Sequence, residues 1–172
     1  VGIGPVSVPD DALLPTPDDV AALDADPVRC FHGATSAAMV AEIDDCLAKA
    51  PDIDYVTFAG SGEPTLHSGI GDIISFIKDR YPRYRVAVLT NGALFVDPDV
   101  RAALMRADLV VPSLDAVSED IFRDINRPSP GITAGQVVAG LVAFSREFPG
   151  VIWLEVFIVP GKNDTDEELL RL

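Results

Sequence analysis

The residues of this chain best suited to chemistry are small polar ones that follow short apolar runs. The stretch Gly60–Thr65 reads Gly-Ser-Gly-Glu-Pro-Thr and follows the apolar run Ile53–Ala59. Its glycines let a ligand approach the backbone closely, and Pro64 disfavours a helical conformation at Glu63. Carbonyl groups freed at a strand end can accept hydrogen bonds from an ammonium group. The stretch predicts a ligand-binding loop, although a tight turn that only connects two elements fits the same spacing.

Similar residues accompany three further apolar runs. They are Thr90–Gly92, Ser113–Asp115, Glu155 and Gly161–Asn163. If the runs are parallel strands, their carboxyl ends meet at one edge of a sheet, which is where such sheets bind ligands. We therefore predict a polar ligand site at this edge. The competing interpretation is that polar residues mark ordinary loops.

The elements that would position these residues alternate regularly. Strands are predicted at 53–59, 85–89, 108–115 and 152–159, because these runs are apolar, rich in β-branched residues and without helical spacing. Helices are predicted at 36–49 and 70–80, and beginning near 98, 119, 134 and 166. This alternation predicts an α/β fold with a parallel sheet and right-handed crossovers.

The length of the chain limits the architecture. A complete (β/α) TIM barrel needs about 250 residues, whereas this chain has 172. We predict a partial (β/α) TIM-like barrel over 35–172, preceded by an irregular leader over 1–34. Because the chain starts at Val1 and its last helix looks unfinished, we expect a fragment. A doubly wound sheet is the alternative.

Helix signals sharpen these assignments. Asp97, Ser118 and Thr133 are predicted N-caps, since their side chains can accept hydrogen bonds from the first helical amides. Within 36–49, the helical spacing of Ile43, Cys46 and Leu47 predicts that all three are buried. Cys46 is therefore expected to act as a small core residue rather than as a ligand.

Composition excludes several classes of protein. The net charge of −14 argues against a nucleic-acid partner, which needs clustered Lys and Arg. No run of about 18 apolar residues and no signal peptide is visible, so no membrane partner is expected. Two cysteines give no disulfide framework, which predicts a reducing, cytoplasmic location. Neither His32 nor His67 has partners at the spacing of a zinc site, and His67 is expected to be a solvated loop residue.

Several of the strand-end motifs resemble those of one family in their amino-acid sequence and in their order along the chain. The segment 56–66, VTFAGSGEPTL, is similar to the Gly-Gly-Glu-Pro segment of the radical S-adenosylmethionine (SAM) superfamily. The segment 89–92 resembles that family's third strand end. Ser113–Asp115 and 159–164 resemble the fourth and fifth strand ends of its molybdenum-cofactor cyclase branch. The similarity covers about 36–172 and suggests an iron–sulfur oxidoreductase branch.

The resemblance implies roles for individual residues. By analogy, the loop that follows the first apolar run would hold the amino group of SAM, and the next strand ends would contact its carboxylate, ribose or nucleoside. The implied SAM-binding residues are Gly60, Ser61, Gly62, Glu63, Pro64, Thr90, Asn91, Ser113, Asp115 and Asn163.

The sequence departs from the family at its defining motif. Radical SAM enzymes hold a [4Fe–4S] cluster through Cys-x-x-x-Cys-x-x-Cys, and the reduced cluster cleaves SAM to a 5′-deoxyadenosyl radical. Here Cys30 and Cys46 lie 16 positions apart, so the cluster ligands are not in this chain. The resemblance implies an enzyme with an unknown substrate and a reductant such as flavodoxin or ferredoxin. The alternatives are a cluster-free SAM-binding or scaffold descendant, and an ordinary barrel enzyme that binds a sugar phosphate.

Overall fold

The computed structural model describes residues 36–59 and 62–172. Its centre is a parallel sheet with strand order β1-β2-β3-β4. Tyr55 pairs with Arg85, Ala87 with Leu109 and Leu109 with Val151 along this ladder. The strands are β1 (Tyr55–Phe58), β2 (Arg85–Thr90), β3 (Leu109–Pro112) and β4 (Val151–Ile152). Consecutive strands are neighbours, as in a barrel wall, and the predicted α/β parallel fold is confirmed.

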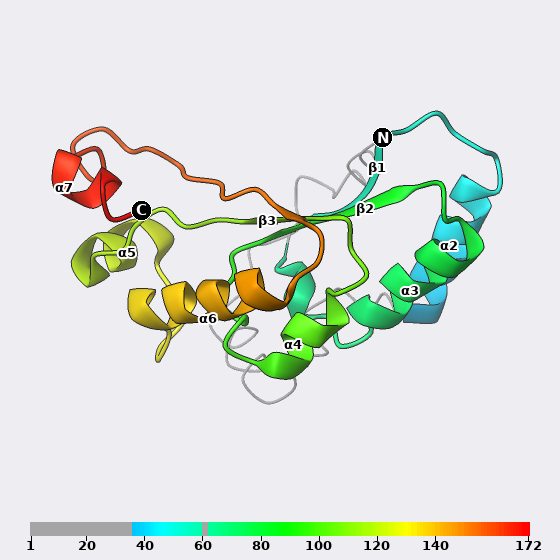
Figure 1. The fold of residues 1–172 in the computed structure, drawn as a ribbon, viewed down its shortest axis with the longest axis horizontal. Coiled ribbons are helices and arrows are strands. Elements are labelled where there is room, and N and C mark those ends of the chain that lie inside the picture. Colours follow the sequence, from blue (N-terminus) through cyan, green and yellow to red (C-terminus); the bar gives the residue numbers. More distant parts are fainter. Residues whose placement is uncertain (1–35, 60–61) are drawn as a thin grey trace, which may run out of the picture.

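Helices lie before, between and after the strands. They are α2 (Ser36–Leu47), the 3₁₀ turn η2 (Pro64–Leu66), α3 (Ile70–Arg80), α4 (Pro98–Ala103), α5 (Glu119–Asn126), α6 (Ala134–Glu147) and α7 (Asp166–Leu169). Figure 1 shows α3, α4 and α6 on the same side of the strands, with α5 and α7 together at one end. Such one-sided cover of a sheet with neighbouring consecutive strands is the arrangement of a partial (β/α) barrel.

The main core lies between this sheet and α3, α4 and α6. Ile73, Ile74 and Ile77 of α3 are fully buried at helical spacing, against the buried strand residues Val86 and Val88. The face of β2 that these helices cover is buried, whereas Leu89 on its opposite face is 37% exposed.

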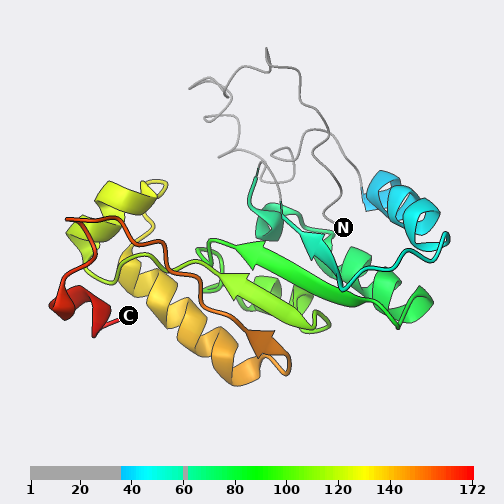
Figure 2. The same ribbon diagram turned by 90° about the horizontal axis from the view of Figure 1, so that it is seen from above.

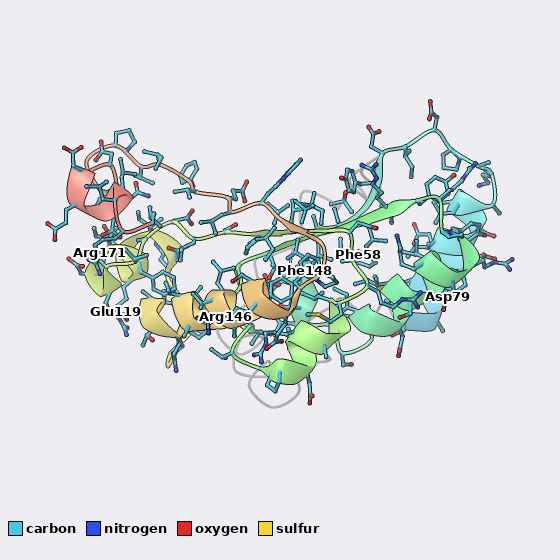
Figure 3. All side chains as sticks on the ribbon, viewed as in Figure 1. Phe58, Asp79, Glu119, Arg146, Phe148 and Arg171 are labelled. Carbon is cyan, nitrogen blue, oxygen red and sulfur yellow. The ribbon has the colours of Figure 1, made fainter. Side chains whose placement is uncertain are left out.

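An aromatic stack joins α6 to the sheet. The rings of Phe95 and Phe144 lie 4.4 Å apart, and those of Phe144 and Phe148 lie 4.7 Å apart. Phe148 is labelled in Figure 3 at the sheet end of α6. Gly140 permits this close approach, because a Cβ at this position would lie 2.7 Å from the backbone nitrogen of Val96.

Two of the predicted caps are confirmed and one is wrong in detail. The Asp97 side chain accepts a hydrogen bond from the Asp99 amide at 2.8 Å, and Thr133 forms a reciprocal capping box with Gln136. Ser118 stands at the N-cap of α5 but its side chain makes no capping bond. Its hydroxyl donates instead to the Glu168 carboxylate, which competes successfully for it.

The predicted burial of Cys46 is wrong. Ile43 and Leu47 are buried, but Cys46 is exposed. Helix α2 packs on α3 at the outer edge of the helical layer, so only a narrow stripe of it is covered (Figure 2). Leu47 lies on that stripe, and Cys46 is turned about 100° from Leu47, toward solvent.

The fourth strand is shorter than the predicted 152–159. Strand β4 covers Val151–Ile152, followed only by an isolated bridge between Ser113 and Glu155. Figure 2 shows this segment running alongside β3 and on toward α7. Within the described residues β4 has one neighbour, β3, so Trp153 and Phe157 of this segment are exposed rather than sandwiched. The apolar run therefore predicted more strand than this single ladder supports.

Some predictions concern residues outside the described ranges. The leader at 1–34, including Cys30 and His32, and the loop residues Gly60 and Ser61 belong to this group. Among the residues that are described, no helix is both long and apolar enough to cross a membrane.

Candidate cofactor-binding rim

The rim is the edge of the sheet formed by the carboxyl ends of the strands and the loops that follow them. Its first part is the loop after β1, in which the Glu63 carboxylate makes most of the hydrogen bonds. Its Oε1 accepts hydrogen bonds from the Thr65 amide at 3.0 Å, the Thr65 hydroxyl at 2.7 Å and the Thr90 hydroxyl at 2.6 Å. Its Oε2 accepts one from the Asn91 amide at 2.7 Å. A single carboxylate thus fastens the loop after β1 to the carboxyl end of β2.

The end of β2 is ordered by the same contacts. Thr90 is buried, and its hydroxyl both donates to Glu63 and accepts from the Gly92 amide at 3.1 Å. Gly92 takes a positive φ of 69°, which favours glycine at this turn. Asn91 is exposed, and its Oδ1 accepts from the Ala93 amide at 2.9 Å. The turn therefore holds the Asn91 side chain at the surface of the rim.

The end of β3 is tied to the segment after β4. The Ser113 hydroxyl donates to Glu155 Oε2 at 3.0 Å. Asp115 Oδ1 accepts from the Phe157 amide at 2.8 Å, and its Oδ2 accepts from the Asn126 side-chain amide at 2.7 Å. Asp115 therefore links β3, α5 and the segment after β4, as Glu63 links β1 and β2.

Asn163 shapes the loop that follows this segment. Its side chain is 0% exposed. Its Nδ2 donates to the carbonyls of Asp115 at 2.7 Å and Phe157 at 2.8 Å, and its Oδ1 accepts from the Val159 amide at 2.7 Å. Because its amide group is occupied by backbone partners, Asn163 holds the loop in shape rather than presenting a polar group to solvent.

Two pockets border this rim. An apolar pocket of about 130 Å³ lies between α2, β1 and α3, beside Gly62, Pro64 and His67. His67 is partly buried there, and its Nδ1 accepts from the Gly69 amide at 3.1 Å, so it is less solvated than the sequence suggested. A larger, charged pocket of about 470 Å³ opens beside Asp115 and Phe157. Only the larger one falls in the usual range for small-molecule sites, about 300–1,000 Å³.

Glu168 is a residue that the sequence analysis did not assign to the rim. It is 2% exposed and accepts hydrogen bonds from the amides of Val117 at 2.6 Å and Ser118 at 2.9 Å. Burial alone would raise the pKa of Glu168, but hydrogen bonds from Ser118 and Val117 outweigh it and lower the pKa below its usual value. The carboxylate attaches α7 to the start of α5. Its position in the first turn of a predicted helix gave no signal of this contact.

Comparison with known proteins decides the family. The profile of the radical SAM superfamily matches residues 34–172. The chain belongs to the radical SAM superfamily. Among the described residues of the motifs that suggested this, Glu63 contacts the end of β2 and Asp115 contacts the segment after β4.

The relatives of this radical SAM chain are longer than the part of them that it matches. It is 43% identical over 131 residues to a protein named GTPase Obg from Brachyspira hyodysenteriae, covering 76% of this chain and 19% of that protein. It is 35% identical to a UPF0026 protein of Synechocystis sp., covering 70% of this chain and 46% of that protein. The chain therefore spans about a fifth of the first relative and just under half of the second.

The fold is shared with a solved structure. A radical SAM methyltransferase from Sphaerobacter thermophilus superimposes with a TM-score of 0.58 at 20% identity, covering 78% of this chain and 42% of that one. At this identity the likeness concerns the fold.

A further match concerns a different family. A stretch of 45 residues, 26% of this chain, is 87% identical to chorismate synthase from Beutenbergia cavernae and covers 11% of that enzyme. This stretch and the 122 residues shared with the Synechocystis protein are together shorter than the 172-residue chain. Besides its similarity to a UPF0026 protein, the sequence thus contains a short stretch similar to a chorismate synthase.

The residues present do not fit the family's iron–sulfur cluster. Three thiolates at close spacing are needed, and the whole sequence has two cysteines. Within the described ranges no three His, Cys, Asp and Glu side chains come together as a metal site. Cys46, the cysteine in that part of the chain, lies exposed on α2.

Proposed function

We propose that this chain is the SAM-binding portion of a radical SAM enzyme, and that SAM lies along the rim from Gly60–Glu63 to Asn163. The observation that supports this most is the Glu63 carboxylate, which joins the family's Gly-Glu-Pro segment to the next strand end. Backbone carbonyls of 60–62 would accept hydrogen bonds from the SAM ammonium. The negative charge of Glu63 favours a cation beside this loop.

Within this proposal the rim residues divide into two groups. Thr90 and Asn163 are positioning residues, since their polar groups already serve Glu63, Gly92 and the loop backbone. Asn91 and Ser113 would contact SAM directly. The Asn91 side-chain Nδ2 makes no hydrogen bond to any described residue, and the Ser113 hydroxyl retains acceptor capacity.

Reductive cleavage of SAM is proposed only for a protein that joins this barrel wall to a cluster loop. The electron needed for that step has no source among the residues of this chain. A reductant such as flavodoxin or ferredoxin, an oxidoreductase activity and a cytoplasmic location belong to that larger proposal, as does the unknown substrate. The second candidate, a cluster-free SAM-binding protein, is favoured by the missing cysteine motif.

The binding proposal is tested by Gly62→Val. A β-branched side chain would block close approach to the loop backbone, so SAM binding measured by calorimetry should fall at least about tenfold. Gly135→Val is the matched control, because a Cβ at Gly135 meets nothing within 4 Å. Unchanged SAM affinity in the Gly62 variant would show that the loop does not bind SAM.

Sequencing the gene distinguishes the two candidate functions, a part of a radical SAM enzyme and a cluster-free SAM-binding protein. We propose that the stretch similar to chorismate synthase stands where a radical SAM barrel carries its cluster loop. Genomic DNA amplified and sequenced across this stretch, and across the junction where it meets the rest of the sequence, should then fail to reproduce the junction. It should give a Cys-x-x-x-Cys-x-x-Cys reading frame instead. A junction reproduced in genomic DNA would favour the cluster-free protein.

A further inference from the structure

The larger pocket at the rim is lined by none of the residues that the SAM proposal assigns as direct contacts of SAM. It lies between the end of α5 and the segment after β4, and has a volume of about 470 Å³. Its walls include Asp115, Asp124, Arg127, Val159 and Lys162. Because it opens at the carboxyl ends of β3 and β4, it occupies the part of a parallel sheet where ligands bind.

Most charged groups in this pocket already have partners. The Asp115 carboxylate is occupied by Phe157 and Asn126. Asp124 forms an ion pair with Lys162. The Lys162 ammonium, by hydrogen bond and charge, and more weakly the Arg127 guanidinium lower the pKa of Asp124. Two cations thus share one carboxylate.

Arg127 differs from its neighbours in having no direct partner. Its guanidinium makes no hydrogen bond or ion pair with any residue in the described part of the chain. A guanidinium offers a rigid fork of donors that matches carboxylate and phosphate groups in two parallel hydrogen bonds. An exposed fork on a pocket wall is therefore suited to hold such a group.

The backbone at Arg127 adds a second observation. It is left-handed, with φ 46° and ψ 56°, at the C-cap of α5. Glycine is the usual residue in this conformation, and any residue with a Cβ is strained there. The side chain of an arginine is thus present at a position where stability alone would favour glycine, which suggests a function for it.

We propose that this pocket binds an anionic group of the substrate, a carboxylate or a phosphate, and that Arg127 anchors it. This proposal deepens the proposed function by naming a class of substrate. It rests on the proposed function only because it identifies the bound anion as part of the enzyme's substrate. Lys162 supports the same anion as the second cation. The Asp124–Lys162 pair keeps the Asp124 charge from repelling it.

The test measures anion binding directly, without SAM. Calorimetry at low salt with inorganic phosphate and with succinate should show saturable binding of one of them to the whole chain. Arg127→Gly should weaken it about tenfold or more. The same substitution should leave the melting temperature equal or higher, because glycine relieves the left-handed strain. Lys162→Met should also weaken binding, since it frees the Asp124 charge.

The matched control is Arg146→Ala. Arg146 is an exposed arginine of α6, labelled in Figure 3, and does not line the pocket. Tighter binding of phosphate would indicate a phosphorylated substrate, and tighter binding of succinate a carboxylic acid. The proposal is overturned if neither anion saturates the chain, or if Arg127→Gly binds as the wild type does. Because SAM is absent from these titrations, their failure leaves the Gly62 result unaffected.

Discussion

At each end of the rim a carboxylate links two neighbouring segments through hydrogen bonds, but the surroundings of the two carboxylates differ. At the β1–β2 end, the Glu63 carboxylate takes four hydrogen bonds from Thr65, Thr90 and Asn91, and it joins buried hydroxyls. At the β3–β4 end, the Asp115 carboxylate takes two, from Phe157 and Asn126, beside an open, charged pocket. The first carboxylate closes the space between neighbouring strands, whereas the second borders a space that stays open.

This difference suggests a division of labour along one edge of the sheet. The Glu63 carboxylate accepts four hydrogen bonds and so holds its loop in one geometry. A cofactor that a whole family binds in the same way requires such a fixed loop. A carboxylate beside an arginine without a direct partner in the described part of the chain, Arg127, leaves room for a ligand that differs between members. The comparison predicts that substitutions at the Glu63 end disturb the fold more than those at the Asp115 end.

The largest expected effect is that of Glu63→Ala. It leaves the Thr65 and Thr90 hydroxyls and two backbone amides without their acceptor, and should lower the free energy of unfolding by about 2–3 kcal/mol. Denaturant titration measures this change. Glu42→Ala, at an exposed carboxylate of α2, is the control and should change stability by less than about 0.5 kcal/mol.

Asp115→Ala should have a smaller and more local effect. The loss is about 1–2 kcal/mol, because fewer hydrogen bonds are broken and the Phe157 side chain is exposed. Hydrogen exchange should show faster exchange of the Phe157 amide, with the amides of β2 unchanged. Equal loss of protection in β2 would contradict the division between the two ends.

Acid should act on the β3–β4 end through Glu168. Its pKa is lowered in the folded chain, so its contribution to stability is complete above its unfolded pKa, about 4.3, and is lost as pH falls through the lower folded value. Glu168→Gln should be less stable near pH 6, by about 1 kcal/mol, and should lose less stability than the wild type on acidification. Glu167→Gln, at an exposed carboxylate of the same helix, should retain the wild-type pH dependence.

The smallest effect is expected for Ser113→Ala. Its hydroxyl makes one exposed hydrogen bond, to Glu155, so stability should fall by about 0.5 kcal/mol. SAM affinity should fall more than stability if Ser113 contacts the cofactor. A variant that binds SAM normally would restrict the cofactor to the β1–β2 end.

Local patterns in the sequence predicted the order of elements well. Apolar runs gave the four parallel strands, and Asp97 and Thr133 gave helix starts, because these signals depend on near neighbours in the chain. Cys46 was placed wrongly because helical spacing shows which residues share a face but not how much of that face is covered. The predicted length of the fourth strand was wrong for a similar reason, because an apolar run does not show how many neighbouring strands are present to pair with it.

The carboxylate links could not be predicted. Glu63 and Thr90 are 27 residues apart, and Ser118 and Glu168 are 50 apart, so each pair meets only through strand register and helix packing. Arg127 gave no signal either. Its importance comes from a left-handed backbone and the absence of a described partner, neither of which a residue type reveals.

The exposed segment after β4 has a consequence for measurement. Trp153 is the single tryptophan of the sequence, and it is 60% exposed on that segment. Its fluorescence therefore reports on one known place, a few residues along the chain from the Phe157 wall of the charged pocket. Anything that covers this edge of the sheet, whether another strand, another domain or a ligand, should shift the emission of Trp153 to shorter wavelength.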